Sequence, residues 1–228
     1  MKRIGLLLIF LGALMSVFQP ARAQSDEPLA LVMTADGPIM PPMYEYIKRG
    51  VETAERENAE VLIIQLNTPG GLIDTMKSIV EIIRASDVPV IVYVSPRGAW
   101  AGSAGALITM SSHASAMAPE TVIGFASPVG GSGEDLGETM KAKQMEALTS
   151  IARTLTERRG DKAVALAEAM IVEAKAVTAS EALQVHLIDF VADDVDDLLK
   201  SLDGFTVQMS DGPRALETSN ARTEPLEM

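Results

Sequence analysis

Two short apolar runs, residues 61–66 and 89–94, constrain the fold of this chain more than any other feature. Neither run alternates polar with apolar side chains, so each predicts a β-strand that is buried on both faces. Helical periodicity marks residues 41–58, which begin with two prolines, and residues 72–85. This alternation of buried strands and helices predicts right-handed βαβ crossovers and an α/β fold with a mostly parallel sheet.

The rest of the chain continues the alternation. Further strands are predicted at residues 29–34, 114–117, 121–125 and 188–191. Further helices are predicted at residues 103–111, 139–159, 161–171, 178–186 and 195–202. Gly160 is expected to close one helix, Asp161 to cap the next, and Thr178 with Glu181 to form a capping box. Residues 130–137 hold four glycines among Ser and acidic residues, so we expect a mobile surface loop there.

Three segments follow from the pattern. Residues 1–23 resemble a secretory signal peptide, with Lys2 and Arg3 before an apolar stretch and a small-residue cleavage site at residues 21–23. A membrane anchor is the alternative, but the apolar stretch is shorter than the ~20 residues that a span needs. Residues 24–203 are expected to form one domain. Residues 204–228 are expected to be a polar C-terminal segment, with no closing helix or strand beyond Asp211. A linker to a membrane region is one role that such a segment could have.

Composition excludes several kinds of site. The chain has no cysteine, which rules out a Cys nucleophile and thiolate metal ligands, and only two histidines, which disfavours a multi-His metal centre. We expect no metal and no cofactor. The formal net charge of −12 disfavours nucleic-acid binding through a basic surface.

Two glycine-rich turns each follow a predicted buried strand and precede a helix. The first holds residues 66–71 (Leu-Asn-Thr-Pro-Gly-Gly) and the second residues 98–105 (Gly-Ala-Trp-Ala-Gly-Ser-Ala-Gly). Glycines let the backbone N–H groups approach a ligand, and carboxyl ends of parallel strands are where α/β proteins bind ligands. Both turns are candidate oxyanion sites; two plain tight turns are the alternative.

Ser103 is the candidate nucleophile of the second turn. Its neighbours are all small, which leaves its hydroxyl accessible, and the N–H groups of Ala104 and Gly71 are candidate oxyanion donors. A plain helix N-cap is the alternative role for this serine.

A family resemblance now adds to these residues. Several stretches resemble the ClpP-class membrane-associated serine proteases of the NfeD (nodulation-efficiency D) family: 67–72, 101–105 (Ala-Gly-Ser-Ala-Gly), 117–121, 123–124, 159–160 (Arg-Gly), 178–182 and 187–189. The resemblance extends from about residue 29 to residue 202. It implies a ClpP/crotonase-like fold, a spiral of ββα units, with Ser103 as nucleophile. It places the oxyanion hole at Gly70, Gly71 and Ala104.

The general base that the resemblance implies is a lysine, which falls on Lys143. Lys141 competes for the role, because it lies somewhat nearer the centre of the apolar stripe of the same helix. A lysine base must be neutral, so its pKa must fall from ~10.4 towards ~7–8 through burial; Met140, Met145 and Phe125 are candidate walls. Many relatives have Asn where this chain has Glu146. The 130–137 loop is expected to carry Lys143 over the site.

A histidine base is not visible. His113 lies only ten residues after Ser103, and His186 lies near a helix end. Both are expected to be structural.

We therefore expect an exported serine endopeptidase with a Ser–Lys dyad that cleaves apolar segments of stomatin-like membrane proteins. We expect it to act in the periplasm or another extracytoplasmic space, as a homodimer or larger homo-oligomer. Substrate, membrane association and assembly are implied by the resemblance alone. The alternatives are a crotonase-like acyl-CoA enzyme and a non-catalytic scaffold that binds a membrane partner through the same groove.

Overall fold

The computed structural model describes residues 27–128 and 137–226. The predicted signal peptide and all but the last residue of the 130–137 loop lie outside these ranges. Among the described residues, no helix is both long and apolar enough to cross a bilayer.

A six-stranded sheet, parallel at every pairing, organises the domain. Its strand order is β11 (Arg222–Leu226), β1 (Leu29–Asp36), β2 (Val61–Asn67), β3 (Val90–Val94), β5 (Ala114–Met117) and β8 (Phe190–Val191). All of β3 and all of β2 except Gln65 and Asn67 is buried. The prediction of buried strands in a parallel sheet is therefore confirmed.

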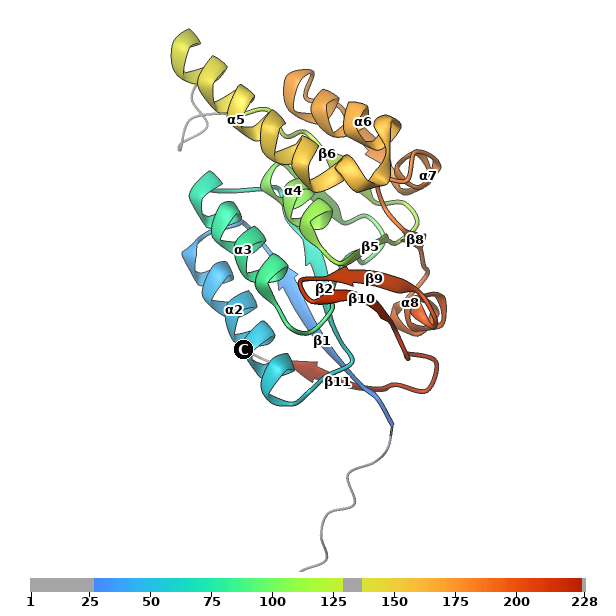
Figure 1. Cartoon of the computed structure of the whole chain (residues 1–228). Coiled ribbons are helices and arrows are strands. Elements are labelled where there is room, and N and C mark those ends of the chain that lie inside the picture. Colours follow the sequence, from blue (N-terminus) through green and yellow to red (C-terminus); the bar gives the residue numbers. More distant parts are fainter. Residues whose placement is uncertain (1–26, 129–136, 227–228) are drawn as a thin grey trace, which may run out of the picture.

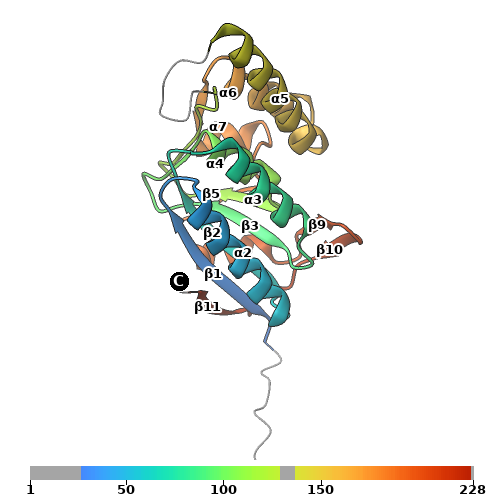
Figure 2. The same ribbon diagram turned by 90° about the vertical axis from the view of Figure 1, so that its left-hand side faces the viewer.

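Each face of this sheet has its own apolar core. One core packs against α2 (Pro41–Arg56), α3 (Ile73–Ala85) and α4 (Ala104–Ser111), beyond which lie α5 (Glu138–Thr156) and α6 (Asp161–Val172). Figure 2 shows α2 and α3 in front of the strands. The other core packs against α8 (Val195–Leu202) and the antiparallel hairpin of β9 (Thr206–Met209) and β10 (Gly212–Ala215). Successive residues of each strand serve opposite cores because side chains alternate across a sheet.

A second, three-stranded sheet positions the candidate nucleophile. β4 (Trp100–Gly102) pairs in parallel with β6 (Val122–Gly124), and β6 pairs in antiparallel fashion with β7 (Ala176–Thr178). Ser103 follows β4 directly and precedes α4. This sheet therefore sets the point at which the chain turns into α4.

Helix boundaries agree with the sequence within a few residues. The capping box of Thr178 and Glu181 is present at α7 (Ala179–Gln184), so that prediction is confirmed. The expected cap at Asp161 is wrong: Gly160 holds the cap position with φ +92°, and Asp161 is the first residue of α6. The helix predicted at residues 139–159 ends instead in a 3-10 turn, η1 (Glu157–Arg159).

The expectation for residues 204–228 needs correction. Beyond Asp211 the chain forms β10 and then β11, which pairs with β1 at the edge of the main sheet. Leu216 and Thr218, between these strands, are buried. Pro225 argues against a strand when the sequence is considered alone. An edge strand nevertheless tolerates proline, because one side of its backbone needs no sheet partner. The described residues up to Leu226 thus fold onto the domain, and the domain does not end at residue 203.

Candidate active site

Ser103 has a strained backbone at the start of α4. Its φ of 50° and ψ of −114° lie where residues other than glycine are rarely found. Such strain persists only where the surroundings enforce it, and it concentrates at functional sites. The side chain makes no capping hydrogen bond to α4. Ser103 therefore holds the N-cap position of α4 without acting as a side-chain cap.

Backbone hydrogen bonds to two neighbouring segments enforce this conformation. The Ser103 N–H donates to the Gly124 carbonyl over 2.7 Å, and the Gly102 N–H donates to the Thr68 carbonyl over 2.9 Å. A Cβ on Gly102 would stand 2.9 Å from the Pro69 carbonyl oxygen, which leaves no room for a larger residue. The serine is thus fixed between β6 and the first glycine-rich turn.

Gly70 brings the first glycine-rich turn against Ser103. It has φ +112°, and a Cβ built on it would lie 2.6 Å from the Cβ and 3.2 Å from the Oγ of Ser103. Only glycine allows both this conformation and this approach. The structure therefore brings the two glycine-rich turns together, as the sequence suggested.

The backbone donors around Ser103 are not equivalent. The Gly70 N–H donates to the Thr68 hydroxyl over 3.1 Å, so it is already used. The N–H groups of Gly71 and of Ala104, the first residue of α4, have no hydrogen-bond partner among the described residues. These two donors are free to hold an anion, aided by the partial positive charge of the α4 N-terminus.

The structure does not bring either candidate lysine to Ser103. Lys141 and Lys143 both lie on the first turns of α5 and are exposed, and neither ammonium forms a hydrogen bond or ion pair with a described residue. α5 rests on the core through Leu148 and Ala152, and its amino-terminal end projects at the edge of the molecule (Figure 1). Lys143 lines an open hollow of about 450 Å³ together with Met140 and residues 137–139.

The apolar walls expected around the lysine are also not assembled. Met140 is 53% exposed and Phe125 is 48% exposed, while Met145 packs partly against the core. Phe125 instead lies beside Trp100, with ring centroids 6.0 Å apart. Trp100 lies three residues before Ser103 and is 53% exposed. The sequence patterns did not single it out as a candidate site residue. Trp100 is the only tryptophan of the chain, and this was the one sequence signal that could have marked it as a candidate.

His113 is structural, as expected. The side chain is buried, and its Nδ1 accepts a hydrogen bond from the Val90 N–H over 3.0 Å. Burial first, and then nearby Arg84 and Arg158, lower the pKa of His113 to about 4. The ring is therefore neutral near pH 7 and serves to join the α4–β5 turn to β3. His186 lies after α7 with φ +61° and is exposed.

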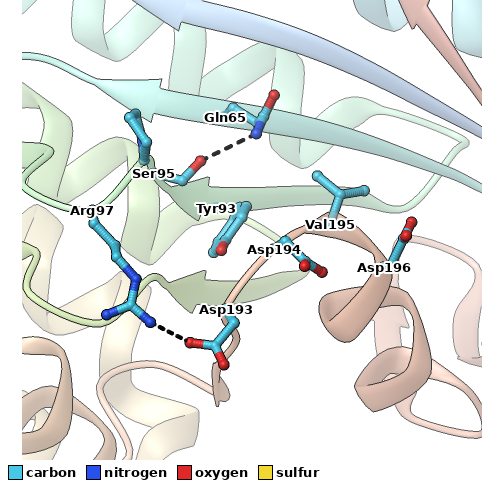
Figure 3. A pocket seen from close by; sticks show the side chains of 9 residues that line it. Gln65, Tyr93, Ser95, Arg97, Asp193, Asp194, Val195 and Asp196 are labelled. Atoms are coloured by element: carbon cyan, nitrogen blue, oxygen red, sulfur yellow. Dashed lines mark hydrogen bonds and ion pairs between the residues drawn. The ribbon is translucent and has the colours of Figure 1, made fainter.

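One large cavity lies away from Ser103. It has a volume of about 580 Å³ and is lined by Gln65, Tyr93, Arg97 and three aspartates near the start of α8 (Figure 3). Gln65 and Tyr93 face the core on the α8 side of the sheet, whereas α4 packs on the other side. Arg97 pairs with Asp193 over 2.7 Å and with Glu120 over 3.0 Å. In the described part of the chain, no three carboxylate or imidazole groups gather as metal ligands.

A family model and two curated proteins match this chain. The model described as "NfeD1b, N-terminal domain" matches residues 32–210. The membrane-bound protease PH1510 of Pyrococcus horikoshii is 37% identical over 211 residues, which are 92% of this chain and 46% of that protein. The membrane protein NfeD1b of Bacillus subtilis is 27% identical over 230 residues, 96% of this chain and 51% of that protein. The chain thus spans about half the length of these relatives.

Solved structures match as well. The 1510-N membrane-bound stomatin-specific protease, as a Lys-to-Ala mutant in complex with a substrate peptide, matches with a TM-score of 0.82 and 32% identity over 89% of this chain and 94% of that one. A Ser-to-Ala mutant of 1510-N matches with a TM-score of 0.81 and 33% identity, over 89% and 99%. ClpP1 from Listeria monocytogenes, at 16% identity and a TM-score of 0.60 over 73% and 94%, shares the fold alone. The chain has the ClpP-like α/β fold, as the sequence predicted; the crotonase fold is related to it.

Proposed function

The chain belongs to the family of the NfeD1b N-terminal domain, and from this premise we propose that it is a serine endopeptidase in which Ser103 is the nucleophile and Lys143 the general base. The observation that carries the proposal is the geometry at Ser103. A strained serine faces Gly70, with two unpartnered backbone donors, those of Gly71 and Ala104, beside it.

The proposed reaction is acyl transfer. Neutral Lys143 accepts the proton of the Ser103 hydroxyl as Oγ attacks the peptide carbonyl. The N–H groups of Gly71 and Ala104 stabilise the oxyanion of the tetrahedral intermediate, each donor contributing roughly 3–4 kcal/mol. The lysine returns the proton to the leaving amine. Water, activated by the same lysine, then hydrolyses the acyl-enzyme. Gly70 contributes its backbone conformation rather than a hydrogen bond.

The choice of Lys143 over Lys141 rests on spacing. In 1510-N, the mutated serine and lysine are one residue further apart in sequence than Ser103 and Lys143, and three residues further apart than Ser103 and Lys141. Lys143 therefore needs the smaller shift of register. Because both lysines are exposed on a projecting helix end, the first turns of α5 must approach Ser103 when substrate binds.

An apolar peptide is the proposed substrate. 1510-N is described as stomatin-specific, and one of its structures holds a substrate peptide. The exposed rings of Trp100 and Phe125 support an apolar substrate here, since Phe125 follows Gly124, whose carbonyl binds the Ser103 N–H. We propose a segment of a stomatin-like membrane protein as the natural substrate.

The setting is proposed on the same basis. Relatives described as membrane-bound or membrane proteins support membrane association of the whole protein. Export through a signal peptide at residues 1–23, a periplasmic or other extracytoplasmic site, and assembly into a homodimer or larger homo-oligomer complete the proposal.

Peptide cleavage tests the proposal. A peptide from the apolar C-terminal part of a stomatin-like protein is incubated with the wild-type chain and with Ser103→Ala, Lys143→Ala and Lys141→Ala, between about pH 6 and pH 10. We expect Ser103→Ala and Lys143→Ala to lose at least a thousandfold in kcat/KM, while Lys141→Ala keeps activity within a few fold.

Other outcomes assign the site differently. Loss of activity in Lys141→Ala alone would move the base by two positions. Cleavage that survives Ser103→Ala would remove this serine from the mechanism. Tight peptide binding without cleavage by the wild-type chain would favour a non-catalytic scaffold.

A further inference from the structure

A second cavity, of about 380 Å³, lies at the carboxyl end of α4. Its walls include Arg158 and Arg159 of η1, His113 of the α4–β5 turn, and strand β9. Ser103 and His113 flank opposite ends of α4, which separates this cavity from the candidate active site. Nothing in the proposed protease mechanism uses it.

The cavity wall carries uncompensated positive charge. Arg159 and Asp189 pair through two parallel contacts of 2.8 and 2.9 Å, and the remaining capacity of Asp189 is taken by the N–H and hydroxyl of Ser115. Arg158 forms no ion pair with a carboxylate in the described part of the chain. Arg158 is exposed overall, and its pKa is lowered, first by partial burial and then by Arg159 and Arg84, because no nearby acid offsets these charges fully.

Several hydrogen-bond donors of the same wall have no acceptor among the described residues. Arg158 donates only to the Ser112 carbonyl, over 3.1 Å, which leaves most of its N–H groups without a described partner. His113 uses Nδ1 as an acceptor, so the neutral ring carries its proton on Nε2, where it is a donor. The Nε–H of Arg159 is buried without an acceptor among the described residues. An anionic ligand would supply the missing acceptors and the missing charge at once.

The wider electrostatics point the same way. Arg84 and Arg214, from α3 and β10, also act on His113 and help to depress its pKa. Two arginines, Arg158 and Arg159, line the cavity, and two more act on His113 in its wall, in a chain whose formal net charge is −12. Such a local concentration of positive charge attracts anions although the protein as a whole repels them.

We propose that this cavity binds a phosphate-type oxyanion, held by the guanidinium of Arg158 and the Nε2–H of His113. A tetrahedral oxyanion presents oxygens in several directions, which suits donors that come from different elements of the wall. Free phosphate and the headgroup of an anionic phospholipid offer the same chemistry. The proposal does not depend on the protease assignment.

Two arms of one experiment test it on the full chain. In the first, inorganic phosphate is titrated by calorimetry at constant ionic strength, with chloride as the competing anion. In the second, flotation compares vesicles of phosphatidylglycerol and phosphatidylcholine with vesicles of phosphatidylcholine alone. Both arms use Arg158→Gln and a matched control, Arg153→Gln, which removes an exposed guanidinium from α5.

We expect saturable binding that weakens at least about tenfold in Arg158→Gln and is unchanged in Arg153→Gln. Binding of phosphate alone identifies a free anion as the ligand, and Arg158-dependent flotation with phosphatidylglycerol identifies the headgroup. The proposal is overturned if neither probe binds, or if Arg158→Gln and Arg153→Gln weaken binding equally.

Discussion

At the scale of single residues, the position of Ser103 depends on the absence of a side chain at Gly70. The serine holds a backbone conformation that favours glycine, and the glycine leaves the space that the serine side chain fills. The sequence indicated both turns, because glycine and small residues cluster after buried strands. The sequence could not indicate that the Gly70 N–H donates a hydrogen bond to the Thr68 hydroxyl, since that bond depends on a side-chain rotamer.

Replacing Gly70 by alanine is expected to lower activity more than stability. The new Cβ must displace Ser103, so we expect kcat/KM to fall at least a hundredfold. The positive φ adds about 1–2 kcal/mol of strain to the folded state. Gly212→Ala is the matched control, because Gly212 has φ +136° but no atom within 4 Å of the built Cβ. Equal activity of the two variants would contradict the assignment of Gly70 to the site.

His113 makes stability depend on pH. The pKa of His113 is about 4 in the folded protein and 6.5 for an unperturbed histidine, as in the unfolded chain. Between pH 4 and pH 6.5 the unfolded chain therefore binds a proton that the folded protein does not. The free energy of unfolding should therefore fall as pH falls, by about 3 kcal/mol between pH 7 and pH 4 from this group. In His113→Asn the amide accepts from Val90 without titrating, so urea denaturation should show a correspondingly smaller fall. Parallel pH profiles for the two proteins would contradict this explanation.

At the scale of elements, local sequence signals predicted what is local and missed what depends on partners. The capping box of α7 lies within four residues, and the sequence suffices to find it. The short strands β4 and β7 are three residues each and exist because they pair with β6. β11 is likewise set by its partner β1 rather than by its own residues, two of which are charged.

Removal of β11 tests its place in the sheet. Ending the chain at residue 220 exposes the backbone of β1 and removes the hydrogen bond from the Tyr46 hydroxyl to the Leu226 carbonyl. We expect a loss of about 2–3 kcal/mol and a Tm lower by roughly 5–10 °C, with self-association through the open edge. Thermal unfolding and sedimentation of the full and shortened chains measure both effects. An unchanged Tm would show that β11 adds nothing to the domain.

At the scale of the whole molecule, the alternation of buried strands and helices predicted the α/β class, and the family resemblance implied the ClpP-like fold. The position of the base was not predictable in this way. Lys141 and Lys143 lie on a helix end that projects from the body, so helical periodicity around a core says little about where their side chains go. Ser103, the proposed nucleophile, instead lies between β4 and α4, next to a glycine-rich turn that the sequence shows directly.

Covalent labelling tests the central proposal, that Ser103 is an activated nucleophile. The full chain is incubated with an alkyl fluorophosphonate, and the intact mass and the modified peptide are determined by mass spectrometry. We expect one adduct per chain, on Ser103, and none in Ser103→Ala. An unlabelled wild-type chain, or equal labelling of Ser103→Ala, would contradict the proposal.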